Sequence, residues 1–186
     1  MAGATPALLI IDMISPLDFP DAERMAGPAL AAARRIRSLR ARFHARGWPV
    51  VFANDNFARW RADFRELTAI AAAAGGSASQ IATLLAPLPD DYFVLKPKHS
   101  AFLASPLPVL LAKLGVRRLV LTGMALEGCV TATATDANAR EYEVAVVSDA
   151  VAGLPGLHAP SLQVLRGSSA ARVIDSRRVL AWAAAG

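Results

Sequence analysis

Cysteine is almost absent from this chain: among its 186 residues there is one, Cys129. A single cysteine excludes a disulfide within the chain and fits a reducing compartment. Long apolar runs are also missing, since none reaches the roughly 18–20 residues of a membrane-spanning helix. The first residues lack the basic segment of a signal peptide. We therefore expect a cytoplasmic protein with no membrane partner.

Charged residues (19%) and aromatic residues (6%) are scarce, whereas hydrophobic residues make up 54% of the chain. This balance excludes an intrinsically disordered protein and predicts a substantial core. The length fits one domain, and the sequence shows no internal repeat and no linker. We therefore predict a single domain over residues 1–186.

A net charge of +5 raises the alternative of a nucleic-acid binder. Much of the excess lies in one segment, in Arg34, Arg35, Arg37, Arg40, Arg42 and Arg46. Apolar residues recur there at helical spacing, which predicts that the arginines occupy the opposite, solvated face of a helix. Interleaved aromatic residues for base stacking are missing. We therefore expect no nucleic-acid partner.

Apolar runs of strand length alternate with helical patterns along the whole chain. Continuous apolar strands are typical of a parallel sheet that helices cover on both faces. The expected strands are 7–11, 50–53, 92–95, 119–122, 144–147 and 172–174, and the expected helices are 28–46, 77–85, 107–114, 128–141, 160–166 and a short one within 176–184. This alternation predicts an α/β fold, doubly wound in three α/β/α layers.

Three reactive side chains follow predicted strands: Asp12 the first, Lys96 the third and Cys129 the fourth. The carboxyl ends of parallel strands meet at one edge of the sheet, where α/β proteins bind their ligands. Each residue also has a plain alternative, namely a turn aspartate, a solvated lysine and a small buried cysteine.

Together these three residues form a coherent catalytic set. The carboxylate takes the thiol proton, and the ammonium stabilises both the carboxylate and the thiolate. The thiolate then forms a thioester, which water hydrolyses with the same carboxylate as base. Backbone N–H groups in the turn between Gly123 and Cys129 are placed to hold the oxyanion.

Four segments carry a resemblance to a known family: 8–13 with Phe19 downstream, 96–102, 121–130, and 133–137 leading to 147–150. They resemble the isochorismatase-like cysteine hydrolase superfamily, which includes nicotinamidases and N-carbamoyl amidohydrolases, and they occur in the family's order. The resemblance implies an Asp–Lys–Cys triad at Asp12, Lys96 and Cys129. It also implies a six-stranded parallel sheet in the order 3-2-1-4-5-6 and a homo-oligomer, a dimer or a tetramer.

The same resemblance implies a cis peptide between Met124 and Ala125, because the matching bond is cis in the family. The N–H groups of Ala125 and Cys129 would then form the oxyanion hole. Alignment on the Ser-Ala-Phe that ends the second segment selects Lys96, and not Lys98, as the catalytic lysine. The position of Lys96 directly after an apolar strand supports the same choice.

Two departures from the family pattern concern the pocket. Nicotinamidases carry a metal-binding Asp-x-His after the second strand, but Phe57 stands where that histidine would fall. We therefore expect no zinc or iron site of this kind, and no cofactor. The Asn54-to-Phe57 segment resembles a bacterial branch of the superfamily instead. Leu126-Glu127-Gly128 replaces the Thr-Asp pair common before the nucleophile, which bears on the pocket's shape and not on the triad.

Five residues are candidates for substrate contact: Phe19, Asn54, Asp55, Trp60 and Phe102. The aromatic ones are expected pocket walls, with ordinary packing as their alternative. The polar pair follows the second strand at the same sheet edge and is placed to hydrogen-bond a polar substrate. His158 is expected to be structural, at a helix start.

The sequence thus predicts a cysteine-dependent hydrolase of a small-molecule amide or N-carbamoyl C–N bond. One alternative is vinyl-ether hydrolysis of the isochorismatase type, which does not need the cysteine, so the presence of Cys129 favours acyl chemistry. The other alternative is a catalytically silent oligomeric binding protein on the same fold.

Overall fold

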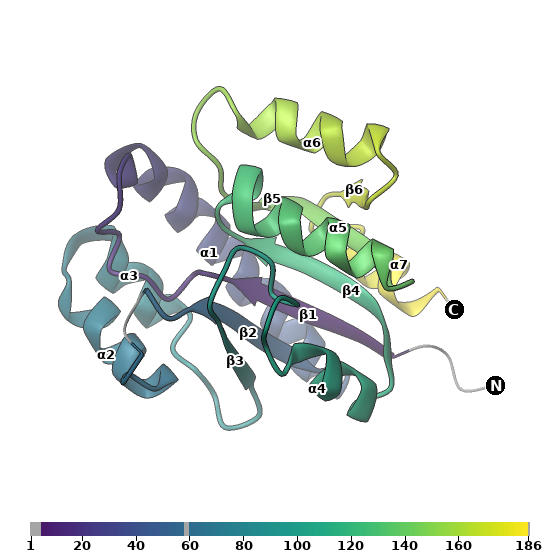
Figure 1. Ribbon diagram of the computed structural model, residues 1–186, viewed down its shortest axis with the longest axis horizontal. Coiled ribbons are helices and arrows are strands. Elements are labelled where there is room, and N and C mark those ends of the chain that lie inside the picture. Colours follow the sequence, from purple (N-terminus) through teal and green to yellow (C-terminus); the bar gives the residue numbers. More distant parts are fainter. Residues whose placement is uncertain (1–4, 58–59, 186) are drawn as a thin grey trace.

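A six-stranded parallel sheet forms the centre of the molecule, in the order β3-β2-β1-β4-β5-β6 (Figure 1). The computed structural model describes residues 5–57 and 60–185. The expectation of no signal peptide rests on the first residues of the chain, most of which lie outside the described ranges. The strands are β1 Thr5–Ile11, β2 Val50–Asp55, β3 Tyr92–Lys96, β4 Val116–Gly123, β5 Glu143–Val151 and β6 Arg172–Ile174. The predicted α/β class and strand order are confirmed.

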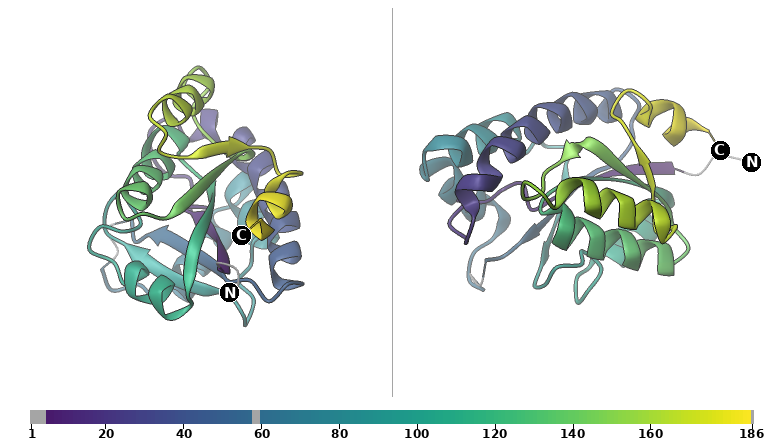
Figure 2. Two further views of the ribbon diagram at one scale, coloured as in Figure 1. Left: turned by 90° about the vertical axis from the view of Figure 1, so that its right-hand side faces the viewer. Right: turned by 90° about the horizontal axis from the view of Figure 1, so that it is seen from above.

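Helices cover both faces of the sheet (Figure 2). One layer contains α1 Ala22–His44, α2 Phe64–Ala73, α3 Gly76–Leu84 and α7 Val179–Ala184; the other contains α4 Leu107–Lys113, α5 Thr131–Ala139 and α6 His158–Gly167. Side chains of β1 point alternately into the two cores, Leu8 and Ile10 into the first and Leu9 and Ile11 into the second. The continuous apolar strands therefore reflect burial on both faces, as expected.

Helix α2 is absent from the sequence prediction. Its N-cap, Asp63, accepts a hydrogen bond from the Glu66 N–H at 2.8 Å. An acidic cap followed three residues later by glutamate is a capping signal that could have located this helix. Within the described ranges, no helix is both long enough and apolar enough to cross a membrane.

One arginine of the basic helix α1 contradicts the predicted solvated face. Arg40 is buried, forms an ion pair with Asp91, and donates to the Ala86 carbonyl at 2.9 Å. Its guanidinium also lies over the Phe52 ring, 5.5 Å from the ring centre. The prediction fails at Arg40 because Asp91 supplies an anionic partner there, and helical periodicity cannot reveal a partner from another part of the chain.

The ends of β1 and β4 touch, which brings the residues after them together. Gly123 ends β4 with φ +109°, and a Cβ there would lie 2.0 Å from the Ile11 carbonyl oxygen, so only glycine fits. The next N–H, of Met124, donates to that same oxygen at 2.9 Å. The Met124–Ala125 peptide is cis, as the resemblance implies. Asp12 leaves β1 with φ +53°, a left-handed conformation that aspartate tolerates better than most residues.

Candidate active site

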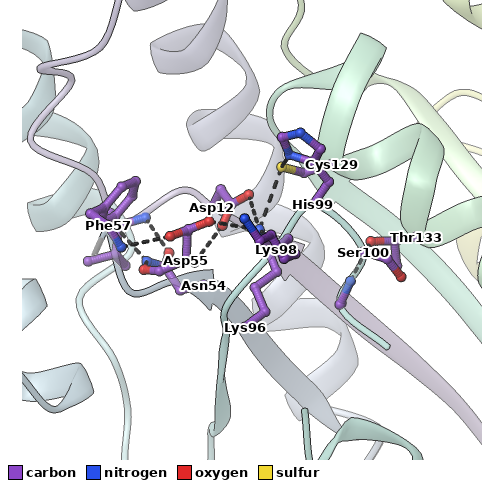
Figure 3. Close-up of polar contacts among 12 residues, drawn as sticks. Asp12, Asn54, Asp55, Phe57, Lys96, Lys98, His99, Ser100, Cys129 and Thr133 are labelled. Carbon is purple, nitrogen blue, oxygen red and sulfur yellow. Dashed lines mark hydrogen bonds and ion pairs between the residues drawn. The ribbon is translucent and has the colours of Figure 1, made fainter. Parts of the chain in front are cut away.

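Lys96 lies at the centre of a polar cluster at the carboxyl edge of the sheet (Figure 3). Its side chain is fully buried, and its Nζ lies 2.8 Å from Asp12 Oδ2 and 3.5 Å from Cys129 Sγ. It also donates to the Lys98 carbonyl at 3.0 Å. The structure thus brings the three predicted catalytic side chains together, and it contradicts the alternative of a solvated Lys96.

Asp12 is held by donors on both of its oxygens. Oδ2 pairs with Lys96, and Oδ1 accepts the Asp55 N–H at 2.6 Å. Burial raises the pKa of Asp12 above its ordinary value, although the Lys96 charge and these hydrogen bonds act in the opposite direction. Asp12 is therefore a stronger base than an exposed carboxylate.

Cys129 lies in a single π-helical turn, η1 Leu126–Val130, that precedes α5. The Ala125 carbonyl accepts from the N–H groups of both Gly128 and Val130, each at 3.1 Å. The sequence predicts one continuous helix over 128–141, because a π turn has no distinct apolar pattern. Such turns occur often at functional sites. Here the turn leaves Cys129 only partly buried.

The charges of the cluster favour a neutral thiol in the free protein. Burial and the Asp12 charge raise the pKa of Cys129 to about 12, although Lys96 acts to lower it. Burial alone would lower the pKa of Lys96, but the charges of Asp12 and Cys129 raise it, so the lysine stays an ammonium. Once the thiol proton moves to Asp12, the repulsion from that carboxylate disappears, while the Lys96 charge remains to stabilise the thiolate.

The raised pKa of the thiol predicts a specific pH dependence. Alkylation of Cys129 by iodoacetamide should be slow at neutral pH and should keep rising toward a pKa of about 12, because only the thiolate reacts. Intact mass measured over time at increasing pH gives the rate, with free cysteine, whose pKa is about 8.5, as the reference. A rate that levels off below about pH 8 would contradict the neutral resting thiol.

The two polar candidates for substrate binding occupy different positions. Asp55 is partly exposed, and its Oδ2 lies 3.6 Å from Lys96 Nζ, so it borders the cluster. Asn54 is fully buried, and its amide accepts the Ile14 N–H at 3.1 Å and donates to the Ile14 carbonyl at 2.9 Å. Asn54 therefore holds the segment after β1 in place, and its geometry does not support the predicted contact with substrate.

The three aromatic candidates lie in different environments. Phe102 is buried, with its ring 5.7 Å from that of Tyr142 and 5.1 Å from the Arg140 guanidinium carbon, which is ordinary core packing. Phe19 packs against the core on the α1 side of the sheet, and Trp60 is 76% exposed. A role in the pocket stays a prediction for all three.

Two further polar residues lie in or beside the nucleophile turn, Glu127 within it and His99 next to it. Glu127 accepts the Leu154 N–H at 3.1 Å, and its other oxygen would lie 2.6 Å from a Cβ at position 153, so this glycine leaves room for the carboxylate. In the sequence, the only sign that Glu127 matters is that Leu126-Glu127-Gly128 replaces the Thr-Asp pair common in the family. His99 Nδ1 lies 3.7 Å from Cys129 Sγ. His99 lies in the 96–102 segment, where no pattern in the sequence gives it a role.

The residues after β2 do not fit a metal ion of the nicotinamidase kind. Asp55 uses one carboxylate oxygen to accept the Phe57 N–H at 2.7 Å and presents the other to Lys96, while the Phe57 side chain offers no ligand. Across residues 5–57 and 60–185, no three His, Cys, Asp or Glu side chains form a group that could hold a metal.

Comparisons with known proteins give matches over most of the chain. Residues 6–178 match the family model described as "Isochorismatase domain". The chain is 37% identical over 152 residues to the "Uncharacterized isochorismatase family protein YaaI" of Bacillus subtilis, an alignment that covers 82% of this chain and 83% of that protein.

Two solved structures show the same fold. An isochorismatase family protein from Desulfovibrio vulgaris matches with a TM-score of 0.76 and 26% identity, over 97% of this chain and 98% of that one. N-carbamoylsarcosine amidase from Thermoplasma acidophilum matches with a TM-score of 0.63 and 28% identity, over 92% and 96% of the two chains.

Proposed function

Since the chain belongs to the isochorismatase family, we propose that it hydrolyses a small-molecule amide or N-carbamoyl C–N bond through a thioester on Cys129. The observation that carries the proposal is the position of Lys96, whose Nζ lies 2.8 Å from Asp12 and 3.5 Å from the Cys129 sulfur. This arrangement pairs a nucleophile with a base and holds a fixed positive charge beside both. The similarity to an N-carbamoylsarcosine amidase supports the bond class.

The proposed first half-reaction follows from these contacts. The thiol proton moves to Asp12, and the sulfur attacks the carbonyl carbon of the substrate. The N–H groups of Ala125 and Cys129 hold the oxygen as it becomes negative. The C–N bond then breaks as Asp12 gives this proton to the leaving nitrogen, and the acyl group stays on sulfur as a thioester.

The second half-reaction restores the thiol. Water attacks the thioester carbon and loses a proton to the Asp12 carboxylate, and the C–S bond breaks. The sulfur then recovers the proton held by Asp12. Lys96 stabilises the thiolate whenever Asp12 is protonated, so the site keeps one positive charge beside the sulfur throughout.

A hydrolysis screen tests the proposal directly. Primary amides, ureas and N-carbamoyl amino acids are incubated with the protein, and release of ammonia or amine is measured with Cys129→Ala as the blank. The proposal expects release by the wild type and none above background by the variant. Equal release by both proteins, or no release from any compound, would refute it.

Hydrolysis should not depend on a metal ion, because Phe57 supplies no ligand and carboxylate, ammonium and thiolate chemistry needs no Lewis acid. Exhaustive treatment with EDTA followed by gel filtration should leave kcat and KM unchanged. The same treatment of a zinc hydrolase serves as the control for chelation. Loss of activity that one added metal ion restores would overturn this prediction.

A further inference from the structure

The nucleophile turn η1 contacts the loop that follows β5, residues 152–154. The Leu126 N–H donates to the Ala152 carbonyl at 2.7 Å. One residue further on, the side chain of Glu127 reaches the same loop, and its Oε1 accepts the Leu154 N–H at 3.1 Å. Glu127 therefore links the loop after β5 to the turn that contains Cys129.

The loop is shaped to receive this carboxylate. Gly153 is buried, and a Cβ there would lie 2.6 Å from Glu127 Oε2 and 3.2 Å from Leu126 Cβ. Contacts of 2.6 Å to a Cβ are too short to persist, so a larger residue at 153 would displace the glutamate side chain. The glycine thus allows the close approach that the link needs.

Stability does not account for this glutamate. Its Oε2 is buried and has no hydrogen-bond partner among residues 5–57 and 60–185. A buried polar atom without a partner costs free energy, and an apolar side chain would avoid that cost. The position of Glu127, two residues before the nucleophile, points instead to a role in the reaction.

The backbone between Glu127 and Cys129 gains from such a link. Gly128 stands between them, and glycine restricts the backbone less than any other residue. The peptide that joins Gly128 to Cys129 carries one of the two N–H groups proposed for the oxyanion hole, and Ala125 carries the other. Glu127 lies between these donors in the chain, so its anchor limits how far one can move relative to the other.

We infer that Glu127 is a positioning residue, which fixes the nucleophile turn so that the N–H groups of Ala125 and Cys129 converge on the oxyanion. This inference rests on the proposed function. The carboxylate itself does not touch substrate, since Oε2 is buried and Oε1 is bonded to the Leu154 N–H. It acts through the backbone, in attack on amide and ester carbonyls alike, because both reactions form an oxyanion.

The test compares Glu127→Ala with Glu127→Gln, which keeps an oxygen for the Leu154 N–H. Two substrates with the same acyl group are used, the best amide of the screen and the corresponding 4-nitrophenyl ester. Loss of an oxyanion donor costs about 10²–10³-fold, so displaced donors in Glu127→Ala should slow amide turnover and the burst of 4-nitrophenolate by about 10-fold or more. KM of Glu127→Ala, and all rates of Glu127→Gln, should stay within about threefold of the wild type.

Alkylation separates the oxyanion hole from the sulfur. Iodoacetamide reacts with Cys129 by displacement at a saturated carbon, which forms no oxyanion. The alkylation rate of Glu127→Ala at one pH should therefore stay within about threefold of the wild-type rate. A parallel loss of alkylation and hydrolysis would show that the variant disturbs the sulfur or the fold, and it would overturn the inference.

Gly153→Ala perturbs the same link from the side of the loop. Its Cβ would displace the carboxylate, so this variant should reproduce the loss in Glu127→Ala, and the two changes together should cost little more than one. Full multiplication of the two losses would contradict a shared mechanism. Should Glu127→Ala not fold, Gly153→Ala provides the same comparison. Glu23→Ala, at an exposed position of α1, is the control and should change nothing.

The outcomes distinguish this inference from the proposed function. Rates are measured well below the thermal unfolding midpoint of each variant, so that a loss of stability is not counted as a loss of catalysis. If Cys129→Ala retained the burst, the proposed function would fail, and the inference with it. A burst that depends on Cys129 but is unchanged in Glu127→Ala would refute the role of Glu127 alone, as would equal losses in Glu127→Ala and Glu127→Gln.

Discussion

Cys129→Ala should lower kcat/KM by about 10⁴-fold or more, because loss of the nucleophile from a catalytic triad leaves only binding and oxyanion stabilisation. The side chain is only partly exposed, and it makes its polar contacts, which include those with Asp12, Lys96 and His99, through the sulfur. Removal of a single sulfur atom there should leave the fold intact, which a circular dichroism melt checks.

Cys129→Ser is the matched variant, since it keeps the size of the side chain and replaces the sulfur by oxygen. A hydroxyl is a much weaker nucleophile than a thiol in a site built around a carboxylate base, so we expect this variant to be strongly impaired as well. If Cys129→Ala kept a tenth or more of the wild-type activity, the thioester route would be wrong. Chemistry that does not need the cysteine, such as vinyl-ether hydrolysis, would then be the better account.

Lys96→Ala should lower the rate by at least about 10²-fold, the scale of a lost positioned electrostatic group. Lys96 is completely buried, and its Nζ lies 2.8 Å from the Asp12 carboxylate and 3.5 Å from the Cys129 sulfur. Without it, neither the buried carboxylate before the proton transfer nor the thiolate after it would have a compensating charge.

Lys98→Ala is the control for this prediction. The Lys98 side chain is exposed, and the contact it makes to Lys96 uses its backbone carbonyl, which alanine retains. Its rate should therefore stay close to that of the wild type. Removal of one partner from a buried ion pair costs about 3–5 kcal/mol, so rates are compared well below the melting temperature of Lys96→Ala. If Lys98→Ala were the impaired variant, the assignment of the third-strand motif would be wrong.

The parts of the site that follow strand ends could be predicted from the sequence. β1, β3 and β4 each contain a continuous apolar run, and Asp12, Lys96 and Cys129 follow these runs. The placement of reactive residues at one sheet edge needs only local patterns and the geometry of parallel strands. The strand order could not be derived from the periodicity of the sequence. Only the family resemblance implied it.

The sequence misses environments that come from distant parts of the chain. The prediction of a solvated helix face is wrong for Arg40, which pairs with Asp91. The predicted contact of Asn54 with substrate stays a prediction, although its amide bonds the Ile14 backbone. His99 received no role because its nearness to Cys129 depends on how the segment after β3 is anchored to α5. Local periodicity contains no information about such pairings.

The most direct test of the account is the mass of the protein during turnover. The wild type is mixed with the 4-nitrophenyl ester, quenched in acid within the burst, digested and analysed by mass spectrometry. The account predicts that the peptide containing Cys129 gains the mass of the acyl group, and that Cys129→Ala gains none. Release of 4-nitrophenolate in a burst with the acyl group on any other residue would contradict it.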